Sequence, residues 1–131
     1  MRFVRTLPRT PDGYTAAGQL ARAGTGASFN YRSACRGRSQ PEFVAKVGVA
    51  ADEADEAENW LLVIRDSEMT AGSDLAAMIS EAGELRAILW ASFCTARQNQ
   101  EHHRAAEEAS EKPQKANGGP RTRKPPLRSI P

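Results

Sequence analysis

The sequence has few aromatic residues, only two cysteines and no long apolar run. Aromatic residues make up 6% of its 131 residues, and valine, isoleucine and threonine are sparse, which argues against a β-sheet. No stretch approaches the roughly 18–20 consecutive apolar residues that a membrane-spanning helix requires. The first residues also lack an apolar segment of signal-peptide length. We therefore expect an all-α protein of the cytoplasm with no membrane partner.

The cysteines and histidines are too few, and too unfavourably spaced, to predict catalysis or metal binding. Cys35 and Cys94 form no CxxC motif and fall in separate predicted helices, so both are expected to be reduced and packed. A nucleophilic Cys35 would require a histidine base, and the sequence places none near it. His102 and His103 are adjacent, whereas two metal ligands on one helix face lie about one turn apart. We predict no catalytic residue, metal, cofactor or small-molecule substrate, and therefore no enzyme.

Charge is unevenly distributed, although the net charge is only +2. Residues 1–46 hold eight basic residues and two acids, whereas residues 47–111 hold four basic residues and fourteen acids. The last twenty residues hold six basic residues and no acid. Blocks of this kind indicate a polyanionic partner or association between oppositely charged surfaces.

Apolar spacing predicts a first helix within residues 12–37, with Leu20 and Tyr31 on its apolar face. Its interior glycines each cost up to about 1 kcal/mol relative to alanine. We attribute Gly18, Gly24 and Gly26 to the close approach of another backbone. Asn30 either forms a hydrogen bond across that contact or lies on the surface, and the sequence does not decide between the two.

Residues 37–43, GRSQPEF, combine a helix stop with a helix start. Gly37 suits the left-handed position that follows a helix. Ser39 and Glu42 have the spacing of a capping box, and Pro41 fits the first turn, where its missing N–H is not needed. A connection this short makes the two helices antiparallel neighbours.

The second helix is expected to span about residues 40–66, with a heptad pattern typical of shallow helix packing. The heptad positions are Phe43, Val47, Ala50, Ala54, Ala57, Leu61 and Ile64. Trp60 widens this seam, and both Trp60 and Trp90 are interpreted as core or interface anchors. The acids between residues 52 and 58 are interpreted as a solvated face, or as partners for the arginines of a neighbouring subunit, because the helix carries no histidine that could join them at a metal.

A third helix is predicted from a cap at Ser73 or Asp74 to about Arg97, with possible fraying beyond. Its seam consists of Leu75, Met78, Ala82, Leu85, Leu89, Ser92 and Ala96, and a second stripe consists of Ile79, Ile88 and Phe93. Residues 112–131 are rich in proline, glycine and cations, so we expect a disordered basic tail. The bundle domain then covers residues 13–111, and its main core or interface positions are Leu20, Tyr31, Phe43, Val47, Trp60, Leu61, Leu85 and Leu89.

From about Thr6 to Arg97 the chain resembles the four-helix-bundle protein family often encoded in intervening sequences of bacterial 23S ribosomal RNA. The matching residues are Gln19-Leu20, Arg22-Ala23, Asn30, Arg38-Ser39, Glu42-Phe43 and the acids around Glu53 and Glu56. The chain departs from the family pattern at Ser33-Ala34, where many relatives have Glu and Gly. Residues 1–12 resemble only a remnant of the family's first helix and a linker.

The resemblance implies an antiparallel up-and-down bundle with three long helices here and four in the family. An apolar trough is expected where the missing helix would lie. The resemblance also implies a bacterial homo-oligomer, because relatives form pentamers. A related accessory protein of diversity-generating retroelements binds nucleic acid. We therefore predict RNA or DNA binding through Arg22, Arg32, Arg36, Arg38 and Lys46. A scaffold whose trough accepts a partner helix, or a truncated relic without activity, are the alternatives.

Overall fold

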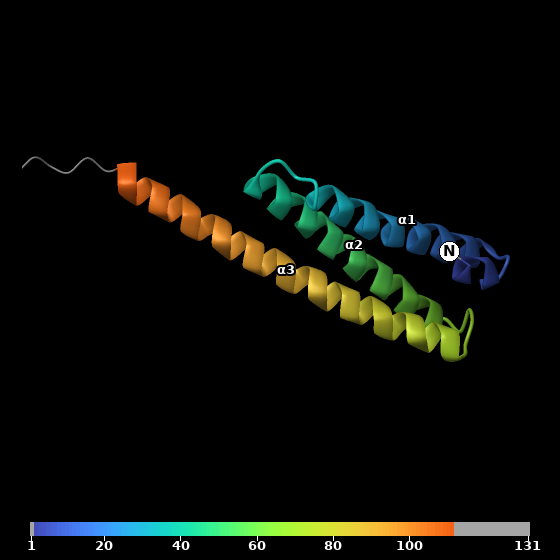
Figure 1. The fold of residues 1–131 in the computed structure, drawn as a ribbon. Helices are drawn as coiled ribbons and strands as arrows, with labels where there is room; N and C mark the ends of the chain where they lie inside the picture. The colour runs from blue at the N-terminus through green and yellow to red at the C-terminus, as the bar shows by residue number, and fades with distance from the viewer. Residues whose placement is uncertain (1, 112–131) are drawn as a thin grey trace, which may run out of the picture.

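The computed structural model describes residues 2–111, which form three long helices and one short 3-10 helix. In chain order these are η1 (Phe3–Thr6), α1 (Pro11–Ala34), α2 (Gln40–Asp66) and α3 (Ser73–Glu111). The long helices alternate in direction, and α2 lies between the other two (Figure 1). Within residues 2–111, α1 and α3 pack on α2 but not on each other. The predicted all-α antiparallel bundle is confirmed, and the predicted tail at 112–131 lies outside the described residues.

α1 begins at Pro11 because the residues around it form a capped first turn. The Thr10 side chain accepts a hydrogen bond from the Gly13 N–H at 3.2 Å, and Pro11 occupies the first helical position. Asp12 adds a negative charge in the first turn, where the helix dipole favours it. α1 therefore begins one residue before the segment 12–37 that the apolar spacing predicts.

Ser39 caps α2 as expected, but the partner of Glu42 and the conformation of Gly37 differ from the prediction. Ser39 Oγ accepts a hydrogen bond from the Glu42 N–H at 3.3 Å, whereas the Glu42 carboxylate accepts from the Arg38 N–H at 3.0 Å rather than from Ser39. Gly37 is not left-handed, so that prediction is wrong. A Cβ atom at Gly37 would lie only 3.0 Å from the Ala34 carbonyl oxygen. The glycine is needed for space in the turn instead.

The predicted seam of α2 forms the centre of the protein. Val47, Ala50 and Ile64 are fully buried, and Ala54 and Leu61 nearly so. Burying a side chain such as Ile64 contributes about 1.5–3 kcal/mol. Because alanine buries little area, the largest part of the core gathers where the larger side chains lie. That cluster consists of Leu7, Ala16, Leu20, Leu61, Ile64 and Leu75.

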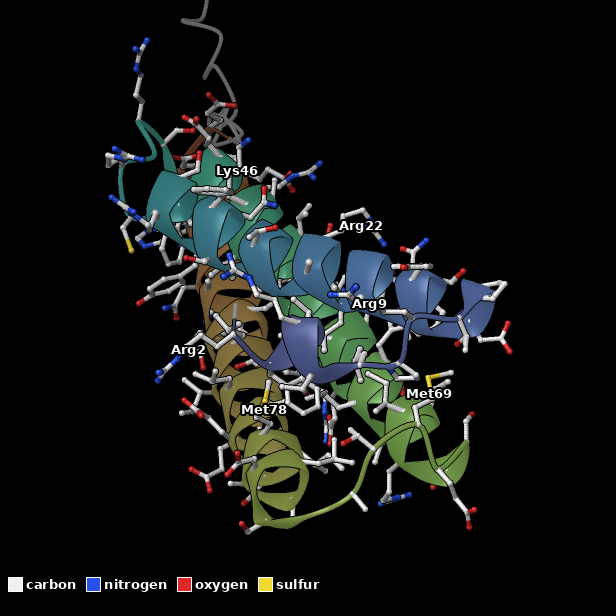
Figure 2. The ribbon with its side chains drawn as sticks, turned by 90° about the vertical axis from the view of Figure 1, so that its right-hand side faces the viewer. Arg2, Arg9, Arg22, Lys46, Met69 and Met78 are labelled. Carbon is white, nitrogen blue, oxygen red and sulfur yellow. The ribbon has the colours of Figure 1, made fainter. Side chains whose placement is uncertain are left out.

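η1 covers one side of this cluster. It lies in the space between α1 and α3, which do not pack on each other within residues 2–111. Phe3 and Val4 pack against the cluster, and Leu7 is part of it. Figure 2 shows η1 lying between α1 and α3. The chain passes so close to α1 that a Cβ atom at Gly13 would lie 2.0 Å from the Pro8 carbonyl oxygen. The segment after Met1 thus fills one end of the space between α1 and α3.

α3 departs from the sequence prediction in burial and in length. Leu85 is 50% exposed and Ile88 is 61% exposed, although both lie on predicted apolar stripes. Among the long helices of residues 2–111, α2 alone packs on α3, so apolar residues beside that contact have no further long helix to cover them. The helix also continues to Glu111, past the ends of α1 and α2 (Figure 1).

Residues 101–111 of this extension are all exposed. Ion pairs one turn apart, Arg97–Glu101 and Arg104–Glu108, both at 3.0 Å, support its helical form. The sequence left fraying beyond Arg97 open, and the structure keeps this part helical because these pairs, together with good helix-forming residues, compensate for the missing apolar contacts.

The loop from α2 to α3 reverses the chain with two residues of positive φ. Glu68 has a φ of 52°, and the Met69 N–H donates to the Ile64 carbonyl at 3.1 Å, which forms a Schellman motif at the end of α2. Gly72 has a φ of 123° and immediately precedes α3. Ser73 is therefore already helical rather than the residue before the helix.

Candidate nucleic-acid interface

Arg22, the first of the five predicted nucleic-acid contacts, is occupied by acids of the same chain. Its guanidinium donates a hydrogen bond to Glu56 and lies 3.6 Å from the Glu53 carboxylate. The hydrogen bond and charge of Glu56, with help from Glu53, raise the pKa of Arg22 above its ordinary value. Arg22 therefore bridges α1 and α2. The two carboxylates beside it weaken its attraction for a phosphate.

The acids of α2 form ion pairs with both neighbouring helices. Glu53 and Glu56 bind Arg22 of α1. On the other side of α2, Glu58 and Asp55 bind Arg86 of α3, and the distance from Arg86 to Asp55 is 3.7 Å. Both interpretations of this acidic group, a solvated face and a neighbouring subunit's arginines, overlooked arginines of the chain itself. The spacing of two acid pairs on opposite sides of one helix was the available signal, since each side faces one arginine.

Arg32, Arg36 and Arg38 are exposed where α1 ends and α2 begins. None of them forms an ion pair within residues 2–111. The Arg36 Nε–H donates to the Arg32 carbonyl at 3.3 Å, which holds the Arg36 side chain against the last turn of α1. The structure thus brings three of the five predicted cations to one end of the bundle.

Lys46 is partly buried in α2, near this end of the bundle (Figure 2), and also lacks an ion pair within the described residues. We call Arg32, Arg36, Arg38 and Lys46 the basic end. Figure 2 places Arg22 farther along α1, away from Lys46. The basic end therefore excludes Arg22, both by position and by its ion pairs.

Tyr31 and Asn30 lie on the last turns of α1, next to the basic end. Tyr31 is 45% exposed, and hydrogen bonding with the Cys35 side chain raises the pKa of its phenol above the ordinary value. The Asn30 amide donates to the Gly26 carbonyl at 2.9 Å, within its own helix. Asn30 therefore does not form the hydrogen bond across the helix contact that the sequence left open.

The remaining predicted core or interface residues fall into three groups. Leu20, Val47 and Leu61 are buried, while Phe43, Trp60 and Leu89 are partly buried. Tyr31 and Leu85 are exposed, so a place in the core of the single chain is wrong for both. An interface role for these two stays a prediction.

The α1 glycines differ in how closely other atoms approach them. A Cβ atom at Gly26 would lie 2.7 Å from the Glu53 carboxyl carbon, so this glycine makes room for a side chain of α2 rather than for its backbone. Gly18 has no atom within 4 Å of such a Cβ, and close packing does not explain it. Glu53 Oε2 is buried here without a hydrogen-bond partner, facing Arg22 only at the longer ion-pair distance.

Two other kinds of site, a metal centre and a membrane-crossing helix, are absent from the described part of the chain. Residues 2–111 contain no group of three histidine, cysteine or acidic residues placed to hold a metal ion. They also contain no helix that combines the length and apolar character needed to cross a membrane. No polar or charged residue among them is buried.

Comparisons with known proteins agree with the architecture. The model of the 23S rRNA-intervening sequence protein family matches residues 1–91. A crystal structure of a protein of unknown function from the S23 ribosomal protein family of Bacteroides thetaiotaomicron superposes with a TM-score of 0.64 at 23% identity. The similarity covers 70% of this chain and 85% of that one, and at this identity it concerns the fold alone. No curated protein matches the chain.

Proposed function

The chain belongs to the 23S rRNA-intervening sequence protein family, and we propose that it is a non-enzymatic protein that binds RNA or DNA through its basic end. The observation that carries this proposal is the set of exposed guanidinium groups at Arg32, Arg36 and Arg38, which no acid of residues 2–111 neutralises. The other arginines of the long helices, such as Arg22 and Arg86, are held in ion pairs.

The mechanism is electrostatic. A guanidinium can bind two phosphate oxygens at once, and each phosphate that is neutralised releases condensed counterions. Binding through the four cations of the basic end should give a slope of about −3 to −4 for log affinity against log salt concentration. Cations clustered at one helix connection contact phosphates rather than base edges, so we expect little sequence preference.

The test is fluorescence anisotropy with a labelled single-stranded RNA and a labelled DNA duplex at several salt concentrations. Replacing Arg32→Gln and Arg36→Gln together should reduce the salt slope by about 2, because each arginine contributes about 1. The matched control, Arg97→Gln with Arg104→Gln, also removes two charges but from residues paired to Glu101 and Glu108. Absence of binding at about 50 mM salt, or equal losses in both variants, would contradict the proposal.

A second candidate function, that of a protein–protein module, is favoured by the exposed apolar residues of α3. Leu85 and Ile88 lie beside the α2 contact, where no helix of residues 2–111 covers them. Here the occupant would be a second copy of the chain, giving a homo-oligomer. Analytical ultracentrifugation should then show an assembly that Leu85→Glu dissociates, whereas a wild-type monomer at high protein concentration would contradict this candidate.

A further inference from the structure

A hollow of about 300 Å³ lies between α2 and α3, separate from the basic end. It is lined by Ala51, Asp52, Asp55, Arg86 and Trp90. Trp90 is 54% exposed there, and its ring packs at a tilt of 44° on Phe93, with ring centroids 5.6 Å apart. A large aromatic ring is thus held at the surface beside two carboxylates.

The chemistry of this hollow suits a cation. Tryptophan is the aromatic ring that attracts cations most strongly through its face. Asp52 forms no ion pair within residues 2–111, whereas Asp55 pairs with Arg86 at 3.7 Å and accepts a hydrogen bond from the Asn59 amide at 3.1 Å. Arg86 itself is already bound by Glu58. The hollow therefore keeps a negative charge next to an exposed indole.

We propose that this hollow binds a guanidinium or ammonium group from the chain's own C-terminal residues 112–131. That segment carries six basic residues and no acid, so it complements the charge of the hollow. The proposal does not depend on nucleic-acid binding, because it uses none of the residues of the basic end.

The length of the segment decides which of its cations can reach. Twenty-one residues of α3 separate Trp90 from Glu111, a distance of about 32 Å along a helix at 1.5 Å per residue. An extended chain covers about 3.3–3.6 Å per residue, so roughly ten residues are needed to return to Trp90. Lys112 and Lys115 are too close to the end of α3, whereas Arg121, Arg123, Lys124 and Arg128 are far enough along the chain.

Covalent attachment makes a shallow site sufficient. A ligand tethered by a short linker has an effective concentration on the order of millimolar, so a weak cation site can be occupied without any free ligand. The carboxylates of the hollow are near the surface, and salt should therefore displace the bound cation.

The experiment uses the indole N–H signals in a ¹H–¹⁵N correlation spectrum of the full chain. Trp90 and Trp60 are the two tryptophans, and Trp60 lies outside the hollow, which makes it an internal reference. Replacing Arg123→Gln and Lys124→Gln removes two of the four cations that can reach the hollow, so it should shift the Trp90 signal and leave the Trp60 signal in place. Asp52→Asn, and raising the salt to about 500 mM, should move the Trp90 signal in the same direction.

The matched control removes the same charge from residues that cannot reach. Lys112→Gln with Lys115→Gln should leave the Trp90 signal unchanged. The proposal is overturned if both double variants shift it equally, or if neither does. A Trp90 position that depends on protein concentration would also overturn it, because the cation would then come from another molecule.

Discussion

The part of the bundle that η1 covers and the part beyond η1 differ in how much of the same apolar pattern they bury. At the η1 end, Phe3 and Val4 pack on a cluster that includes Leu61, Ile64 and Leu75. Beyond η1, residues of the same kind and spacing, such as Leu85 and Ile88, are half or more exposed. Helical periodicity thus determines which side of a helix is apolar, but burial requires a neighbour on that side.

The largest effect expected from this comparison comes from one substitution made in both parts of the bundle. Leu61→Ala removes a side chain that is 2% exposed and should lower the free energy of unfolding by about 2–5 kcal/mol. Leu85→Ala removes the same atoms from an open surface and should cost about 1 kcal/mol or less. Urea denaturation measures both, and a loss at Leu85 equal to that at Leu61 would mean that another chain covers this surface.

Two glycines of α1 sharpen the comparison with smaller effects of opposite sign. Gly13→Ala would force a Cβ atom against the Pro8 carbonyl, and overpacking of this kind costs about 1–3 kcal/mol.

Gly18→Ala meets no atom within 4 Å and should stabilise the protein by up to about 1 kcal/mol through helix propensity. The thermal midpoint should fall for the first variant and rise for the second. Equal shifts in one direction would show that residues 3–8 do not pack on α1.

Much of this architecture could be predicted from the sequence. The buried seam of α2 follows its heptads, and the Ser39 cap and the neighbouring antiparallel helices follow from seven residues. The N-cap at Thr10 was not predicted, although residues 10–12, Thr-Pro-Asp, match a typical pattern for the start of a helix. Local chemistry of this kind is readable because its partners lie within a few residues.

The candidate site was harder to predict because it depends on partners distant in sequence. Arg22 and Arg32 look alike in the sequence, yet Arg22 is neutralised by acids more than thirty residues away, whereas Arg32 has no acid partner within residues 2–111. Only the register of α1 against α2 separates them. Composition alone likewise could not place Trp90 beside Asp52 and Asp55.

Hydrogen exchange resolved by residue tests most directly the contrast between the core cluster and the exposed extension of α3. Amides around Leu61 and Ile64 should exchange only when the whole bundle unfolds, because this segment lies in the core cluster. Amides of residues 101–111, which are exposed on a single helix, should exchange orders of magnitude faster. Equal protection of the two segments would contradict the account, since the extension of α3 would then have to be covered by a neighbour.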